Sequence, residues 1–261
     1  MKQSIVITSL SSLLVAIAGC SSHGNSSQPT AASPSDYDDV AQAVGSVVAT
    51  TGGGGEVGSL SDSVDLAVGV VPLGFAIDAS GEFAGSRLGL DYDYQLSCKD
   101  AAGAALSACG FTTNAANVKV DWSGNLGLPN FSAAVTRQGD WSLSGLQTDT
   151  VQFAGDGTFS FDAKFTSIFR PASVEYRLDY AATYDGVTMQ RSLHRVVGGA
   201  IHYSITAERL AASDQKTAEA TFDMAADLSF SSAGTATLVL DGSHRYTVDT
   251  GSGAVARVGA E

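Results

Sequence analysis

The stretch LDYDYQLSC, from Leu90 to Cys98, alternates large apolar residues with polar ones at a period of two. This alternation puts the apolar side chains on one face of a β-strand and the polar side chains on the other. The same period recurs downstream, in residues 118–122, 131–135, 159–165, 174–184 and 222–230. The pattern predicts a series of long strands, each with one apolar and one polar face.

Short turn signals separate many of these segments, which favours hairpins between consecutive strands. The signals lie at residues 155–157, 185–186, 198–199, 232–234, 241–242 and 250–253. Together they predict about thirteen strands, more than a flat sheet holds comfortably. We therefore expect an all-β fold: an antiparallel meander curled into a barrel or half-barrel, with a β-sandwich as the alternative. A membrane-embedded barrel is disfavoured because the C-terminal residues ARVGAE lack an aromatic end.

The predicted hairpins gather an unusual set of residues on one apolar face. A two-residue turn at Asp185-Gly186 and a three-residue loop at residues 198–200 would align Tyr176, Tyr180, Tyr184, Arg191, Arg195 and Tyr203. Arginine on a core face is costly unless it is paired or stacked. The pattern indicates either a cavity for an amphipathic ligand on the concave side, or arginines stacked on tyrosine rings at a barrel rim with their guanidinium groups in water.

Candidate catalytic and metal-binding residues are few. His194 and His202 are predicted to share the polar face of one hairpin with Glu208, and Asp91 and Asp93 point the same way along a strand. These groups could hold a transition metal or calcium or take part in hydrolysis, but a solvated outer face is the better interpretation of both. The motifs GxSxG, HExxH and Walker A do not occur. We assign no catalytic residue, no metal and no cofactor.

The residues that precede the predicted strands have helical periodicity. Val40, Val44, Val47 and Val48 recur at helical spacing, which predicts a short helix between Asp38 and Ala49. The glycines at residues 52–55 should end it. Gly53, Gly55 and Gly58 match a dinucleotide-binding spacing, but no βαβ unit follows, so a hinge is the better interpretation.

The first twenty residues, which end at Cys20, resemble a known type of export signal. Lys2 precedes an apolar run from Ile5 to Ile17, which is too short to span a membrane and is typical of a secretion signal. The residues Ile17-Ala18-Gly19-Cys20 resemble the lipobox of bacterial lipoproteins. The resemblance implies cleavage before Cys20, acylation of Cys20 and, because Ser21 replaces the aspartate of inner-membrane retention, a location at the outer membrane. Acyl chains would anchor the protein without a membrane-spanning helix.

The chain is then divided into four parts. Residues 1–19 are the expected signal peptide, 20–36 a flexible lipidated tether rich in Ser and Pro, 37–58 the helix and hinge, and 59–261 a single β-rich domain. Cys98 and Cys109 remain after lipidation of Cys20. They fit as directly opposed residues of a small hairpin that turns near Gly103, which predicts a disulfide in an oxidising envelope.

Charge restricts the partners. The formal net charge of the 261-residue chain is −13, so nucleic acids are excluded. The expected partners are the membrane, through the lipid anchor, and an amphipathic small molecule or an envelope protein. The sequence favours a noncatalytic cell-envelope lipoprotein that serves as a structural or interaction module. A carrier of a lipid or other amphipathic ligand, and a hydrolase, are the alternatives.

Overall fold

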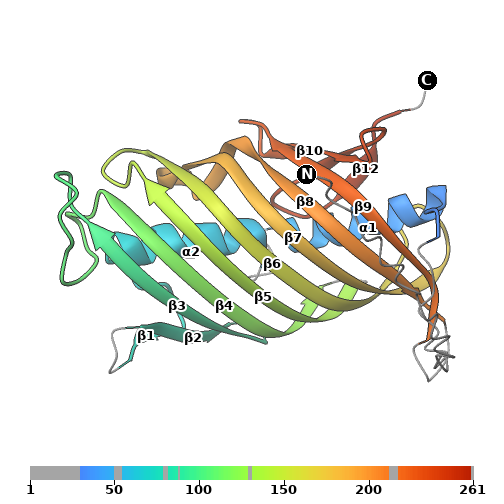
Figure 1. Ribbon diagram of the computed structural model, residues 1–261, viewed down its shortest axis with the longest axis horizontal. Coiled ribbons are helices and arrows are strands. Elements are labelled where there is room, and N and C mark those ends of the chain that lie inside the picture. Colours follow the sequence, from blue (N-terminus) through green and yellow to red (C-terminus); the bar gives the residue numbers. More distant parts are fainter. Residues whose placement is uncertain are drawn as a thin grey trace, which may run out of the picture.

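A single antiparallel sheet dominates the computed structural model (Figure 1). The described residues are 30–49, 55–78, 82–87, 89–128, 131–211 and 217–259. Within them the sheet has twelve strands, and each strand pairs with the next in chain order. The strands are β1 (Phe75–Ile77), β2 (Phe83–Arg87), β3 (Leu90–Lys99), β4 (Ala115–Leu128), β5 (Phe131–Ser144), β6 (Thr150–Thr166), β7 (Ser173–Gln190), β8 (Arg195–Leu210), β9 (Ala218–Phe230), β10 (Thr235–Leu240), β11 (His244–Asp249) and β12 (Val255–Arg257). The predicted meander is confirmed.

The sheet curls around two helices, α1 (Pro34–Val48) and α2 (Glu56–Ala67), which lie on its concave side (Figure 1). It does not close, because β1 and β12 remain its two edges, so the fold is a half-barrel. In β5 the burial alternates strictly along all 14 residues, and the inward side chains include Trp141. The apolar faces of the strands and the helices form one core. The helices therefore occupy the inside of the half-barrel.

The first helix begins earlier than its valine pattern predicted. Pro34 stands in the first turn, and the carboxylate of Asp36 accepts hydrogen bonds from the backbone N–H and the hydroxyl of Ser33. These bonds to Asp36, with Pro34 in the first turn, start the helix at Pro34 instead of near Asp38. The last residues of the predicted tether thus belong to α1.

The second helix was not predicted. Residues 56–58 were assigned to a hinge and the following residues to the β-rich domain, yet α2 spans Glu56–Ala67. Its buried residues Val57, Leu60 and Val64 recur at helical spacing. The surrounding glycines and serines conceal this pattern, because they are poor helix formers. Of the three glycines at dinucleotide spacing, Gly55 precedes α2 and Gly58 lies in it, while Gly53 is outside the described residues.

Three predicted turns are wrong. Asp185-Gly186 lies inside β7 and residues 198–199 lie inside β8, where the two strands pair through a bulge. A Cβ atom on Gly199 would come within 2.3 Å of the carbonyl oxygen of Gly186, so these glycines allow close strand contact and not chain reversal. The reversal occurs at the 3-10 turn Arg191–Leu193 and at His194, which has a left-handed backbone. Residues 155–157, also predicted as a turn, lie inside β6.

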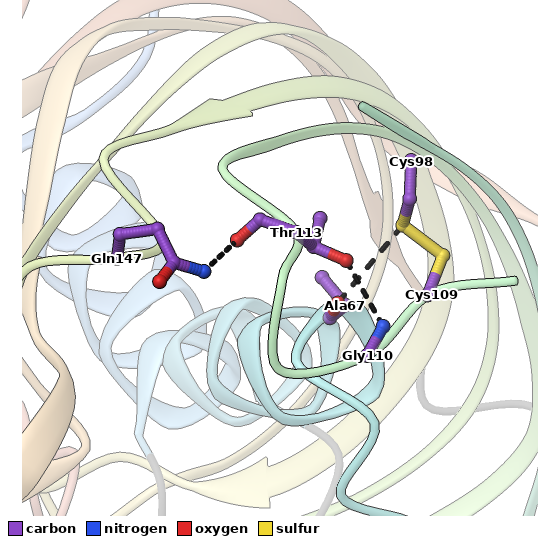
Figure 2. Close-up of a disulfide and its surroundings, with 6 residues drawn as sticks. All are labelled: Ala67, Cys98, Cys109, Gly110, Thr113 and Gln147. Carbon is purple, nitrogen blue, oxygen red and sulfur yellow. Dashed lines mark hydrogen bonds between the residues drawn. A yellow bond between two sulfur atoms is a disulfide. The ribbon is translucent and has the colours of Figure 1, made fainter. Parts of the chain in front are cut away.

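The predicted disulfide is confirmed. Cys98 and Cys109 are bonded, with a Cα–Cα distance of 5.3 Å, close to the C-terminal end of α2 at Ala67 (Figure 2). The two cysteines are not directly opposed, however, because the backbone N–H of Leu106 bonds the carbonyl of Cys98. The bond therefore ties the end of β3 to the loop that follows the hairpin turn.

Candidate functional site

The tyrosines of the predicted cavity lie on the concave face, and two of them, Tyr176 and Tyr184, hydrogen-bond to the helices. Tyr176, Tyr180, Tyr184 and Tyr203 are all at most 5% exposed. The hydroxyl of Tyr176 donates a hydrogen bond of 2.8 Å to Asp36 of α1. The ring of Tyr180 packs against that of Tyr203 at 5.0 Å. The tyrosines form part of a packed core that the helices cover.

The two arginines predicted beside them lie elsewhere. Because the reversal follows residue 190, Arg191 lies in the turn, where its guanidinium donates to the carbonyl of Leu146 at 2.8 Å. Arg195 is the first residue of β8 and pairs with Gln190 at the end of β7. Tyr180 pairs with Ile205, ten residues further along β8, so Arg195 does not lie beside it. The predicted grouping of Arg191 and Arg195 with the four tyrosines is therefore wrong.

A different arginine occupies the concave face. Arg137 of β5 is 2% exposed and holds Glu56 of α2 through two hydrogen bonds, of 2.8 and 2.6 Å. Tyr184 hydrogen-bonds to both, and the guanidinium lies 5.0 Å from the ring centre of Trp141. Burial raises the pKa of Glu56, and the charge and hydrogen bonds of Arg137 oppose this rise. The arrangement is a buried, fully partnered ion pair.

All carboxylates of the two helices are paired, as Glu56 is with Arg137. Five of them face an arginine from the sheet or its loops, and Asp65 contacts His194. The pairs are Asp36–Arg209, Asp38–Arg257, Asp39–Arg170, Glu56–Arg137, Asp62–Arg87 and Asp65–His194. These contacts fix the helices against the concave face and leave their acids engaged in structure.

An accessible hollow lies on the opposite, convex face. It is a groove of about 630 Å³ that crosses β3 to β7, and its floor includes Gly139 and Gly157, which pair with each other. Its walls carry polar side chains of the outward positions, Asp93, Gln95, Lys119, Asp121, Gln138, Asp140, Asp156, Thr158 and Thr183. We call this the convex groove.

Like charges face one another across the strands of the convex groove. Asp93 pairs in register with Asp121, and Asp140 with Asp156. Directly opposed like charges are destabilising. Burial, together with the charges of Asp78 and Asp121, raises the pKa of Asp93. The groove thus has an excess of negative charge that a cationic group would neutralise.

The predicted histidine pair is not formed. His194 contacts Asp65 of α2 at 3.2 Å, whereas His202 contacts Asp227 at 2.6 Å on the convex face. Asp91 accepts a hydrogen bond from Ser86. Among the described residues, no three His, Cys, Asp or Glu side chains are grouped so that they could hold a metal ion.

Cys20 and the signal peptide lie outside the described residues. Neither described helix is long and apolar enough to cross a membrane. No protein-family model matches the chain, and searches of curated proteins and of solved structures found no similar protein.

Sequence reasoning missed Arg137 and the helix carboxylates. Arg137 follows Val135 and precedes Gly139 and Trp141 at the inward positions of β5, so the alternation alone places it on the apolar face. The convex groove is harder to predict from the sequence, because outward-facing aspartates are common on solvated strands. Its acids become notable only when the register sets them opposite one another.

Proposed function

We propose that this chain is a noncatalytic lipoprotein of the bacterial cell envelope, anchored to the outer membrane through Cys20 and acting as an interaction module. The lipobox at residues 17–20 supports the anchor. The described chain begins at Thr30, whose backbone N–H donates to the carbonyl of Thr221 in β9 at 2.7 Å. The residues between Cys20 and Thr30 would then link the folded domain to the membrane.

The observation that carries this proposal is the occupied interior. The concave face that a carrier would offer to an amphipathic ligand is in contact with the helices, and their carboxylates are paired with its arginines. The convex groove is one of the accessible hollows on the outer face, and four aspartates line it beside its single lysine, Lys119. We therefore assign partner binding to the convex groove, and the partner presents cationic groups.

The anchor is tested by replacing Cys20. The Cys20→Ala protein should lose acyl label and leave the membrane fraction. Ser21→Ala is the matched control, because it leaves the acylated thiol in place and should remain membrane-bound. Acyl labelling of the Cys20→Ala protein would disprove the anchor without affecting the assignment of the groove.

The groove is tested with a tetralysine peptide as the cationic probe. Asp121→Asn combined with Asp140→Asn should weaken probe binding roughly five- to tenfold, about 1 kcal/mol, and added salt should weaken it further. Asp162→Asn is the control, because Asp162 lies on the same face but is paired with Arg177. Equal losses in both variants would mean that the probe senses net charge and not the groove.

A separate measurement tests whether the protein is instead a lipid carrier. Native mass spectrometry of protein extracted from its host should find the covalent acyl groups and no further lipid. A stoichiometric bound lipid would transfer the binding role to the concave face. No arrangement of Ser, His and acid among the described residues favours the hydrolase alternative.

A further inference from the structure

Three hollows on the outer face of the sheet join end to end. The convex groove shares lining residues, Lys119 among them, with a hollow of about 740 Å³ on one side. It shares others, Gln138 among them, with a hollow of about 760 Å³ on the other side. All three cross β4, β5 and β6, which lie side by side (Figure 1). We call the joined hollows the outer trough, of which the convex groove is the middle part.

The outer trough runs along the strands. Asn117 lies at one end and Ser123 at the other, both on β4, and a rise of about 3.3 Å per residue places them roughly 20 Å apart. At Gly155 the pairing of β6 with β7 shifts its register, and a bulge of this kind bends a strand. A trough of this length accommodates an extended peptide of about six residues.

The side chains at the two ends of the outer trough suit a peptide backbone. Asn117 at one end, and Ser123 and Thr136 at the other, have no side-chain hydrogen-bond partner among the described residues. Side-chain amides and hydroxyls both donate and accept hydrogen bonds, as the N–H and C=O groups of a bound peptide require. The carboxylates of the convex groove lie between these ends, where they would face basic side chains.

An apolar ligand has little to contact in the outer trough. None of the large exposed apolar residues of the described chain lines it. Its two aromatic residues, Phe159 and Tyr180, are at most 5% exposed and occupy inward positions of β6 and β7. An acyl chain, or the apolar face of a sugar ring, therefore has no exposed ring to pack against.

We propose that the outer trough binds an extended basic segment of a partner polypeptide. Its lysine or arginine side chains lie in the convex groove, and its backbone bonds to the amide and hydroxyl groups at the two ends. This inference rests on the cationic partner proposed above for the convex groove and adds the form of that partner. A compact cation would use only the four aspartates of the middle part, whereas the two outer hollows offer hydrogen bonds to an extended chain alone.

The test compares two peptides with blocked termini, tetralysine and tetralysine with two serines added at each end. Both are titrated into the full chain in detergent at one ionic strength. The longer peptide carries the same charge, so any additional affinity comes from its ends. It should bind at least about fivefold more tightly. Asn117→Ala with Thr136→Val should remove this gain and change the affinity for tetralysine by less than about twofold, and each single variant should remove part of the gain.

Thr237→Val is the matched control, because Thr237 is exposed on β10, outside the outer trough. This variant should keep the gain, and a loss equal to that of the double variant would overturn the proposal. Binding of tetralysine with no gain for the longer peptide would overturn the extended segment and leave the convex groove as a cation site. Competition by chitohexaose, a neutral linear sugar, would assign the trough to a glycan and overturn the peptide. If neither peptide bound, the cationic partner itself would be disproved together with this proposal.

Discussion

The two faces of the sheet differ in how their carboxylates are paired. On the concave side five of the six helix carboxylates face an arginine and the sixth, Asp65, contacts His194, while Glu56–Arg137 is fully buried. In the convex groove Asp93 faces Asp121, and Asp140 faces Asp156 on one side and Lys119 on the other, whereas elsewhere on the convex side Asp162 and Glu208 are paired with Arg177. Charge in the interior is thus arranged to hold the helices, whereas opposed aspartates in the convex groove repel each other across the strands. A surface that retains such repulsion is a better candidate for binding than the interior.

The strongest test of this difference removes the interior cation. Arg137→Met should lower the free energy of unfolding by about 3–5 kcal/mol, because it leaves Glu56 buried without a partner. Urea unfolding measures the change. Lys164→Ala, which breaks an exposed pair with Glu175, should cost at most about 1 kcal/mol. The combined variant Arg137→Met with Glu56→Leu should recover much of the loss, and similar costs at Arg137 and Lys164 would contradict the distinction between the faces.

The second test concerns Gly139 of β5, which lines the convex groove and whose Cβ position is close to Trp141 and Val120. A Cβ atom on Gly139 would lie 2.7 Å from the indole of Trp141 and 2.9 Å from Val120. Gly139→Ala should therefore cost about 1–3 kcal/mol in urea unfolding through overpacking. Gly127→Ala in β4 is the control, since no atom lies within 4 Å of its Cβ position, and it should change stability by less than about 0.5 kcal/mol. Equal effects would mean that intrinsic strand preference, not packing, decides.

The third test uses pH on two neighbouring aspartates of α1. Burial acts to raise the pKa of Asp36, but hydrogen bonds from Ser33, Tyr176 and Arg209 outweigh it and lower the pKa overall. Burial raises the pKa of Asp39 in spite of Ser167 and Arg170. A depressed folded pKa gives stability that is present above the ordinary pKa, near 4, and lost on acidification, while a raised pKa gives the opposite slope.

The stability difference between wild type and Asp36→Asn should therefore shrink as the pH falls from about 7 to 3. For Asp39→Asn, the free energy of unfolding of the wild type should instead increase relative to that of the variant as the pH falls through the raised pKa of Asp39. Urea unfolding of both variants at matched pH values measures the two slopes. Slopes of the same sign would show that the pair titrates as one unit through Tyr176.

The smallest effect is expected in the convex groove. Asp93→Asn relieves repulsion from Asp121 and Asp78 and should stabilise the fold by a few tenths of a kcal/mol, up to about 1 kcal/mol. The same change should weaken binding of the tetralysine probe. A thermal melt and a titration measure the two effects. A variant that loses stability, as Asp162→Asn should when its pair with Arg177 is removed, would indicate that the groove acids are structural.

The sequence predicted the meander because a period of two survives in strands such as β3 and β5, where one side is buried and the other is solvated. It also predicted the turns at residues 241–242 and 250–253, which do connect consecutive strands. A glycine-containing turn signal gave a wrong prediction at Asp185-Gly186, because glycine has two structural uses. It permits chain reversal, and it also permits the close approach of two strands, which depends on a segment elsewhere in the chain.

The site was less predictable than the fold. The disulfide could be predicted because two cysteines remained once Cys20 was assigned to the expected lipid anchor, and local hairpin geometry brought them near. The grouping of Arg191 and Arg195 with the tyrosines depended on the position of a single turn, and a shift of that turn moved both arginines to the strand ends. The ion pairs of α1 join residues more than a hundred positions apart, and no local pattern shows them.

These long separations also have a consequence for the order in which the molecule assembles. Asp36, Asp38 and Asp39 are made early, but their partners Arg209, Arg257 and Arg170 follow 173, 219 and 131 residues later. Each strand can join its predecessor as the chain is synthesised, whereas α1 must wait for β12 before its last carboxylate is neutralised. The N-terminal helix is therefore among the last elements to reach its final place, and a chain that stops before Arg257 cannot complete it.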